Sequence, residues 1–472
     1  MHKAKRSHPN LTLAVLSVAG LAFSMLSSAV VPALPTIQHS LHTTENGVTW
    51  VLTAYLLSAS VGTAIVGRLG DMYGKEHLLL WTLVILSAGT VLAALSNSLA
   101  LLIVARAVQG AGGGIFPLAF GIIRDEFPRD KVAGSIGLMS ALLGIGGGVG
   151  IVVGALIVEH LSWHWLFWLP LALIVAAAVA TWRFVPESPV RVEGRINWVA
   201  ASLMSGGMTL VLVAVSETTA WGWGSARTLL VLAAGAALCV AWILVELRST
   251  QPLIDMALMR VRAVWTANLT AFLLGAGMYS SFVVFPQFAQ LPKSTGFGFG
   301  ASVLGSALYL LPSTGGMFVV GSAAGRIAAR FGSKAALVAG SAVTSVSFGL
   351  LAVQHGHVYD FLISSALLGV GIGLAFAALG NIVVQAVEEH QTGVASGMNT
   401  VMRTVGGALG GQLTATFLAD HLRRGLPTVT GFVDGFVLST CFLVVCTAAA
   451  LLVPGRGSRQ YVERFEEVAA AD

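Results

Sequence analysis

The strongest constraint on the fold is a series of fourteen apolar stretches, each long enough to cross a lipid bilayer as one helix. A bilayer core needs about 20 mostly apolar residues in a helix. Helices also satisfy their own backbone hydrogen bonds, which lipid cannot do for an open chain. We therefore predict an all-α polytopic membrane protein with about fourteen transmembrane helices. The stretches cover residues 11–33, 48–67, 78–98, 99–122, 133–158, 165–182, 196–215, 228–246, 263–285, 300–322, 334–352, 360–383, 392–418 and 432–453.

Composition supports the membrane class. Only 10% of the residues are charged, whereas a soluble protein carries roughly 25%. The three cysteines, Cys239, Cys441 and Cys446, lie inside apolar stretches and indicate neither a disulfide framework nor a metal site.

The basic residues predict an orientation. With the N-terminus in the cytoplasm, 20 lysines and arginines fall in cytoplasmic segments and 4 in external loops, as the positive-inside rule requires. Lys3, Lys5 and Arg6 precede an apolar run that is longer than the about 7–15 residues of a secretory signal. We interpret this run as an uncleaved first helix. The expected location is the bacterial inner membrane, with several membrane passes and both termini in the cytoplasm.

One short motif occurs twice. Residues 67–74 read GRLGDMYG after the second stretch, and residues 325–332 read GRIAARFG after the tenth. The repeat predicts two pseudo-symmetric six-helix bundles with two further helices inserted between them. Such repeats often build alternating access around a midplane site. The predicted domains are the N-terminal bundle (1–190), the inserted helices and linker (191–262), the C-terminal bundle (263–456) and a short cytoplasmic tail (457–472).

Residues 67–75, GRLGDMYGK, match the G-x-L-a-D-r-x-G-r/k signature of the major facilitator superfamily. The chain resembles the fourteen-helix drug–proton antiporter branch of that superfamily over essentially its whole length. The resemblance implies that the loop with Gly67, Asp71, Gly74 and Lys75 governs conformational switching. Physically, the glycines permit a tight turn, and Asp71 can accept hydrogen bonds from a helix N-terminus. The alternative is an ordinary polar turn.

Arg106 begins a second motif, RAVQG, which resembles the R-x-x-q-G element of the family. An arginine at membrane depth costs at least ~2.5 kcal/mol on insertion scales, so it faces a partner or a wet cavity. The resemblance implies a role in proton coupling, for which Asp71 is the other candidate. The alternative is a structural arginine satisfied by backbone carbonyls.

A third resemblance lies in the fifth stretch. Gly137, Gly146, Gly150 and Gly154 have the spacing of the antiporter motif G-x8-G-x3-G-P-x2-G-G, but an isoleucine and an alanine replace its proline and last glycine. We expect these glycines to allow close packing between the two halves. Plain small-residue packing explains them equally well.

The most consequential departure concerns the first helix. The branch typically carries an aspartate where this chain has Leu26. Arg106 and Arg403 are the only charges expected at membrane depth, which favours neutral or anionic lipophiles over dications, because no buried carboxylate would offset a dication's desolvation. Asn399 and Arg403 lie on one helix face, with Arg403 roughly 16 Å into its helix. The full set of candidate cavity residues is Ser24, Ser27, Tyr55, Gln109, Asn268, Tyr279, Tyr309, Asn381, Gln385, Asn399 and Arg403.

These features predict a secondary exporter of small lipophilic compounds, of the drug or antibiotic efflux type, that works by proton antiport. The alternative is an uncoupled or lipid-moving facilitator of the same fold, because Leu26 replaces the acid. A membrane-embedded enzyme is a remote alternative, since the eleven histidines are scattered along the chain. We expect a monomer whose partners are the bilayer, the substrate and protons. We expect no enzymatic activity, cofactor, metal or nucleic acid; the glycine runs 110–114 and 144–150 lack the βαβ context of a nucleotide loop.

Overall fold

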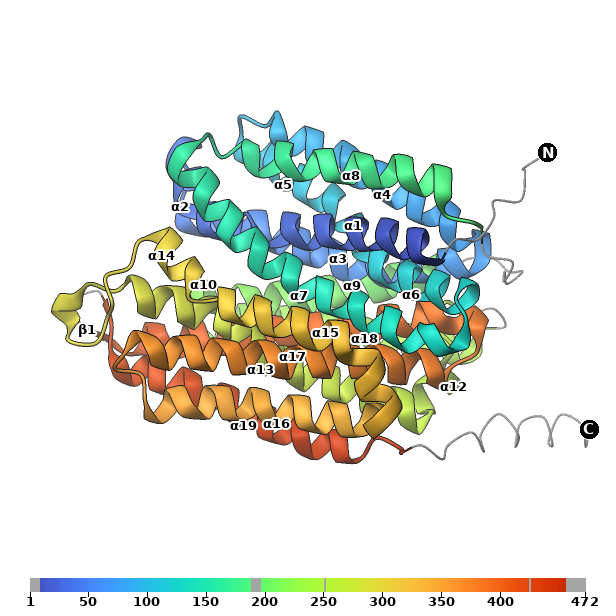
Figure 1. Ribbon diagram of the computed structural model, residues 1–472. Helices are drawn as coiled ribbons and strands as arrows, with labels where there is room; N and C mark the ends of the chain where they lie inside the picture. The colour runs from blue at the N-terminus through green and yellow to red at the C-terminus, as the bar shows by residue number, and fades with distance from the viewer. Residues whose placement is uncertain (1–8, 188–196, 250–251, 424–425, 456–472) are drawn as a thin grey trace, which may run out of the picture.

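A computed structural model describes residues 9–187, 197–249, 252–423 and 426–455. Nearly all of these residues are helical, and the long helices run side by side along one direction (Figure 1). Thirteen helical segments in the described ranges are long and apolar enough to cross a membrane. The prediction of an all-α polytopic membrane protein is therefore confirmed.

The N-terminal helices form the first packed unit. Their apolar side chains make a continuous core that runs from Val15 to Val185. The segments are α1 (Pro9–Ser28), α2 (Leu34–Ser40), α3 (Glu45–Tyr73), α4 (Lys75–Ala94), α5 (Leu99–Gln109), α6 (Ile115–Glu126), α7 (Arg129–His160) and α8 (Trp165–Phe184), with 3-10 turns at Val31–Ala33 and Gly110–Gly114.

The C-terminal helices form a second core, which runs from Leu258 to Val453 and also takes up side chains of α7. Fourteen membrane-crossing stretches were expected, and the one that is not among the thirteen segments is 392–418. This stretch is a helix, but six glycines and five threonines make it less apolar than the others. The segments are α12 (Met256–Arg260), α13 (Arg262–Gln290), α14 (Val303–Leu308), α15 (Leu311–Phe331), α16 (Ser333–Val353), α17 (Val358–Ala386), α18 (Thr392–Asp420), β1 (Leu422–Arg423), β2 (Leu426–Pro427) and α19 (Val429–Leu451), with 3-10 turns at Lys293–Thr295 and Glu389–Gln391.

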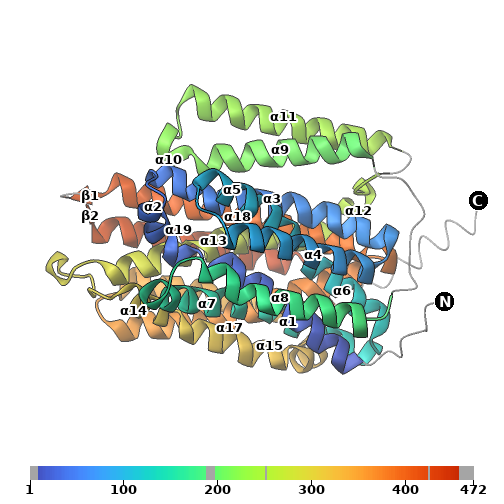
Figure 2. The same ribbon diagram turned by 90° about the horizontal axis from the view of Figure 1, so that it is seen from above.

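Between the two units the chain forms α9 (Trp198–Ser216), α10 (Thr218–Trp221) and α11 (Ala226–Arg248). Figure 2 shows α9 and α11 on one flank of the molecule, outside the other helices. A small third core joins α9 and α11 to α3 and α18. The inserted pair therefore covers the line where α3 and α18 meet. The predicted boundary at 190–191 and the tail 457–472 lie outside the described residues.

Two stretches that were expected to be single helices are interrupted near their middle, and the stretch 11–33 leaves the α-helix at Ser28. The stretch 99–122 changes to a 3-10 turn at Gly110–Gly114, because a run of glycines holds the α-helix weakly. The stretch 300–322 breaks between Leu308 and Leu311, where Pro312 follows in the first turn of α15 and has no backbone N–H to donate.

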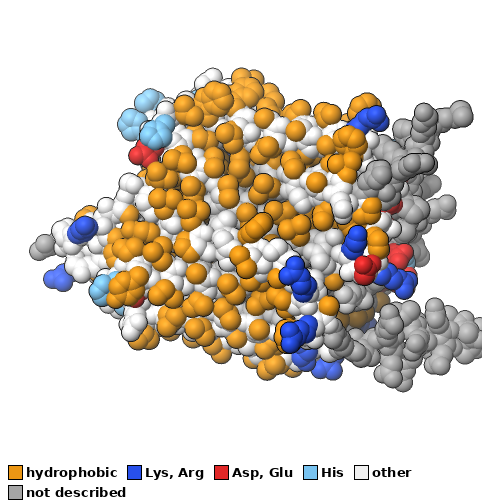
Figure 3. All heavy atoms as spheres, viewed as in Figure 1, with side chains coloured by type: hydrophobic (Ala, Val, Ile, Leu, Met, Phe, Trp, Pro, Cys, Tyr) orange, Lys and Arg blue, Asp and Glu red, His pale blue; other side chains and the backbone are white. Residues whose placement is uncertain are grey.

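The two ends of the molecule differ in charge (Figure 3). Lysines and arginines gather at the end with the α3–α4 turn, which we call the basic end, and apolar side chains cover the middle of the visible face. Described basic residues of this end include Arg68, Lys75, Arg124, Arg129, Lys131, Arg326, Arg330 and Lys334. The pattern is that of a protein whose middle band faces lipid.

Candidate transport site

At the basic end, two charges of the N-terminal unit hold the turn between α17 and α18. The Asp71 carboxylate, near the end of α3, accepts hydrogen bonds from the backbone N–H groups of Gly393 at 3.4 Å and Val394 at 3.2 Å, in the first turn of α18. Arg124 on α6 donates to the carbonyl of Val387 at 2.6 Å, just after α17 ends. A helix is partially positive at its N-terminus and partially negative at its C-terminus. Each charge therefore meets a helix end of opposite sign, and the basic end is closed.

Lys75 supports this contact from within the N-terminal unit. Its Nζ lies 2.6 Å from Asp125 Oδ2 and 3.8 Å from Asp71 Oδ1, and all three side chains are 0% exposed. Gly121 of α6 leaves room for the lysine stem, because a Cβ there would lie 2.7 Å from its Cδ and Cε atoms. Gly74 turns the chain between α3 and α4 with φ of 106°, in the region that favours glycine.

The backbones of α3 and α18 touch directly. A Cβ added to Gly67 would lie 2.9 Å from the carbonyl carbon of Gly393, and a Cβ added to Gly393 would lie 2.9 Å from Asp71 Oδ2. The structure therefore brings Gly67 and Asp71, two of the predicted switch residues, to the contact between the halves. Gly74 and Lys75, the other two, lie within the N-terminal unit: Gly74 forms the turn after α3, and Lys75 pairs with Asp71.

Arg106 is fully buried inside the N-terminal unit. Its Nε donates to the carbonyl of Val51 at 3.1 Å, and its Nη1 donates to Gln109 Oε1 at 2.8 Å and to the carbonyl of Leu26 at 3.5 Å. The guanidinium also lies over the ring of Tyr55, 4.1 Å from the centroid. The arginine therefore joins α1, α3 and α5 through backbone carbonyls, although its Nη2 has no hydrogen-bond partner among the described residues. Its role in proton coupling stays a prediction. At the position where the resembled branch has an acid, the Leu26 side chain packs into the apolar core, and its backbone oxygen accepts from Arg106.

Arg403 lies between the two halves. Its guanidinium is 4.5 Å from the centroid of the Phe376 ring, and the residue is 9% exposed. Asn399, one turn earlier on α18, donates to Asn268 Oδ1 at 3.1 Å. These α17 and α18 residues line a cavity with α6 and α7. Its lining residues are Phe116, Phe120, Ser140, Leu143, Phe376, Leu379, Gly380, Val383, Ser396, Asn399, Thr400 and Arg403.

Three more candidates lie deep in the helix packing. The Ser27 hydroxyl donates to the carbonyl of Ser24 at 3.0 Å, on α1. Tyr279 of α13 packs against α18, where its ring fills the space beside Gly407. Tyr55 of α3 lies under the guanidinium of Arg106. None of these side chains is among the residues that line the cavity.

The remaining candidates do not join this group. Asn381 Nδ2 donates to the carbonyl of Ala133 at 3.1 Å and ties α17 to α7. Tyr309 lies at the break between α14 and α15, and its ring packs on Phe299 at the end opposite the basic end. Gln385 is exposed near the end of α17. In this conformation neither Tyr309 nor Gln385 lines the cavity beside Arg403, because both sit near helix ends.

The four antiporter-motif glycines do not share one face. Gly146, Gly150 and Gly154 pack against α1 of the same unit, where added Cβ atoms would meet the backbone of α1. Gly137 faces Ala324 of α15 in the other half. The expectation that all four lie between the halves is therefore wrong for three of them. A spacing of four residues places those three on the side of α7 that faces α1.

A second small-residue face of α7 contacts α15 along its length. The two helices run antiparallel, and the contacting positions of α7 recur at alternating steps of three and four residues, the period of a helix seam. The paired positions are Gly134 with Gly325, Gly137 with Ala324, Ala141 with Gly321, Gly144 with Met317, and Gly148 with Thr314. The halves therefore approach closely here as well as between α3 and α18.

Substituting Gly150 by alanine is expected to destabilise the protein by about 1–3 kcal/mol, the usual cost of overpacking. The new methyl would lie 2.6 Å from the carbonyl oxygen of Met25, so α1 and α7 must separate. Gly147→Ala on the same helix is the matched control, because no atom lies within 4 Å of its Cβ position. Thermal unfolding in detergent, followed by tryptophan fluorescence, should show a lower Tm only for Gly150→Ala. Equal Tm values would contradict the assignment.

Several residues of the site carried little signal in the sequence. Arg124 is one of several basic residues between apolar stretches, and Asp125 belongs to no motif identified in the sequence. The adjacent charges of opposite sign after the fourth apolar stretch were the available signal. Phe376, which lies on Arg403, is one of many aromatic residues in apolar stretches and carried none.

Comparison with known proteins agrees with this architecture. The family model of the Major Facilitator Superfamily matches residues 16–411. The tetracenomycin C resistance and export protein of Streptomyces glaucescens is 28% identical over 426 residues, which are 89% of this chain and 78% of that protein. The multidrug resistance protein Stp of Mycobacterium tuberculosis is 27% identical over 467 residues, 96% of this chain and 85% of that protein. The crystal structure of the human organic anion transporter MFSD10 (TETRAN) shares the fold, with a TM-score of 0.68, 15% identity and coverage of 94% of this chain and 99% of that one. The chain therefore belongs to the Major Facilitator Superfamily.

Proposed function

We propose that this transporter exports small lipophilic compounds from the bacterial cytoplasm by alternating access, with its basic end and both termini on the cytoplasmic side. The names of its relatives support export, since one is called a tetracenomycin C resistance and export protein and another a multidrug resistance protein. The gathering of basic residues at one end supports the orientation. We also propose that the chain belongs to the fourteen-helix antiporter branch and acts as a monomer.

The observation that carries the proposal is the cavity beside Arg403. It is lined by residues of both halves, three of them phenylalanines, and contains one cation and no acid. A cation beside an aromatic ring suits a substrate with an apolar body and a negative or polar group. The cavity volume is only about 20 Å³, whereas drug-sized sites measure about 300–1,000 Å³. Substrate binding therefore requires the halves to separate.

Opening would begin at the contact between Asp71 and α18. A proton on Asp71 would remove the negative charge that faces the α18 N-terminus and so weaken the closed basic end. This makes Asp71 our candidate for the site where proton movement and conformation are linked. Arg106 would support the site indirectly, since it holds α1 and α3 together.

The second candidate function is uncoupled or lipid-moving facilitation. Two observations favour it: Leu26 occupies the place of the branch's acid, and no acidic side chain lines the cavity. The two functions differ in their dependence on a pH gradient.

A flux assay in proteoliposomes tests both functions. We expect faster transport of lipophilic anions and neutral compounds than of matched cations, and a response to an imposed pH gradient. Arg403→Gln should reduce anion transport at least about tenfold, since one charge-assisted contact is worth about 1.5–3 kcal/mol, and should affect neutral compounds less. Arg227→Gln, which removes an arginine stacked on Trp221 away from the cavity, is the control. Preferential transport of cations would overturn the substrate proposal, and flux that ignores the gradient would favour facilitation.

A further inference from the structure

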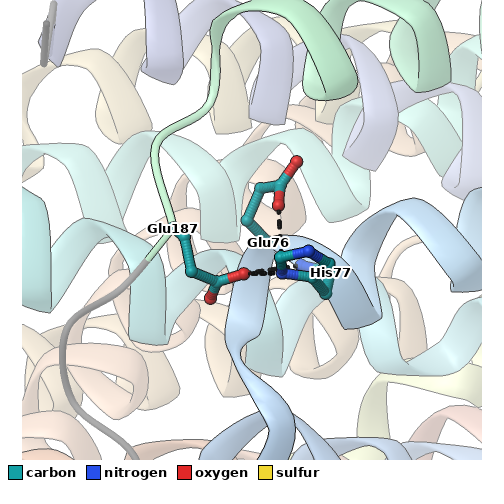
Figure 4. A group of neighbouring side chains, drawn as sticks. All are labelled: Glu76, His77 and Glu187. Carbon is teal, nitrogen blue, oxygen red and sulfur yellow. Dashed lines mark hydrogen bonds and ion pairs between the residues drawn. The ribbon is translucent and has the colours of Figure 1, made fainter. Parts of the chain in front are cut away.

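Three neighbouring side chains at the basic end have no part in the proposed transport mechanism. Glu76 and His77 stand in the first turn of α4, directly after the switch loop, and Glu187 follows the end of α8 (Figure 4). One ligand atom from each side chain lies within 4.8 Å of the other two. The group therefore joins the start of α4 to the chain that leaves the N-terminal unit.

Both carboxylates converge on the same imidazole nitrogen. His77 Nδ1 lies 3.4 Å from Glu76 Oε2 and contacts Glu187 Oε2 directly. A neutral imidazole has at most one proton on that nitrogen, so it cannot donate fully to two carboxylates. A metal ion can accept all three atoms at once. Zinc–ligand distances of about 2.0–2.2 Å place tetrahedral neighbours roughly 3.4 Å apart, the observed separation of His77 Nδ1 from Glu76 Oε2. Glu187, which touches Nδ1, has to draw back for an ion to enter.

The surroundings suit an ion with one open coordination position. The side chain of Glu76 is 8% exposed and that of Glu187 is 22% exposed, which restrains both, whereas His77 is 46% exposed and leaves a path for an ion and a water ligand. Gly74 lets Glu187 come close to the start of α4, since a Cβ at Gly74 would lie 2.7 Å from the carboxyl carbon of Glu187. One nitrogen and two oxygens form a ligand set for zinc or a similar divalent transition ion.

We propose that Glu76, His77 and Glu187 form a binding site for a divalent transition-metal ion at the cytoplasmic face. The ion replaces the hydrogen bond between His77 and Glu187 and fixes the end of α8 to the start of α4. Lys75 directly precedes Glu76, so the ion also stiffens the base of the switch loop. The site does not depend on the proposed substrate or on proton coupling.

The test is a titration of the purified full-length protein, stripped with a chelator and free of any affinity tag. Isothermal titration with Zn²⁺ should show a site that Mg²⁺ does not fill. Glu187→Gln and His77→Gln should each lower the Zn²⁺ affinity at least about tenfold, by analogy with the losses caused by weaker perturbations of metal sites. His357→Gln, which removes an exposed histidine paired with Asp360 at another helix start, should leave the affinity unchanged.

X-ray absorption at the zinc edge of the wild-type protein gives a readout that does not depend on the variants folding. The expected spectrum has one imidazole, oxygen ligands and no sulfur. Three results would overturn the proposal: equal Zn²⁺ affinity in the wild type and both ligand variants, sulfur coordination, or no Zn²⁺ binding by the wild type in the micromolar range. In the last case Glu187 serves as a cap of α4, to which the His77 N–H already donates at 3.3 Å.

Discussion

Replacing Lys75 by methionine is expected to lower the free energy of unfolding by about 3–5 kcal/mol, the cost of breaking a buried ion pair from one side. The lysine Nζ lies 2.6 Å from Asp125 and 3.8 Å from Asp71, and none of the three side chains reaches solvent. Methionine keeps most of the length and volume but leaves two buried carboxylates without their shared cation. Unfolding in mixed detergent micelles, followed by tryptophan fluorescence, would measure the loss.

Two further variants separate charge from packing. Lys131→Met removes an exposed lysine of α7 and should change the stability by less than about 0.5 kcal/mol, as surface substitutions usually do. Adding Asp125→Asn to Lys75→Met removes one of the two carboxylates that faced the lysine and should recover part of the loss. If Lys75→Met is as stable as the wild type, the buried network does not stabilise the fold.

Much of the helical architecture could be predicted because lipid imposes a simple rule on the chain. A segment that crosses a bilayer must be helical and mostly apolar, so hydropathy marks it directly. The rule works less well for α18, which is shielded by neighbouring helices and tolerates glycine, threonine and Arg403. It also says nothing about interruptions, which depend on local residues such as the glycines of Gly110–Gly114.

The site was predicted where a motif specifies a backbone shape. The glycine and aspartate spacing of residues 67–75 placed Gly67 and Asp71 correctly at a helix contact, but could not name the partner Gly393, which lies 322 residues after Asp71. The spacing of Gly146, Gly150 and Gly154 predicted close packing and not its partner, because any helix with small residues would fit there. Partners depend on tertiary packing, which a periodic pattern does not encode.

The candidate cavity residues also show that a sequence pattern does not identify the neighbours of a side chain. Residue type and depth point to polar residues in apolar stretches, and two of these, Asn399 and Arg403, line the cavity between the halves. Depth is misleading near helix ends and breaks, where Tyr309 and Gln385 lie. The proposed domain boundaries stay predictions, since α7 contributes to both cores and 190–191 lies outside the described residues.

The α3–α18 contact leads to the second large expected effect. Gly393→Ala should reduce transport at least about tenfold, because overpacking costs about 1–3 kcal/mol and each 1.4 kcal/mol changes a conformational equilibrium tenfold. The added methyl would meet the carbonyl of Gly67 and both carboxylate oxygens of Asp71, at 2.9 and 3.0 Å. Neither the backbone nor the helix-bound carboxylate can move aside as a flexible side-chain tip would. The closed basic end therefore loses stability relative to the open one.

Gly411→Ala on the same helix is the matched control, since no atom lies within 4 Å of its Cβ position, and it should transport as the wild type does. Spin labels at Tyr73 and Phe331, which are 56% and 61% exposed on the two repeated turns, report the separation of the halves at the basic end. Their distance distribution should shift to longer values in Gly393→Ala and stay unchanged in Gly411→Ala. A loss of transport without that shift would mean that the glycine contact serves folding and does not control the closed state. Unchanged transport and distance in both variants would remove the α3–α18 contact from the switching mechanism, and conformational control would then rest on the antiparallel seam between α7 and α15.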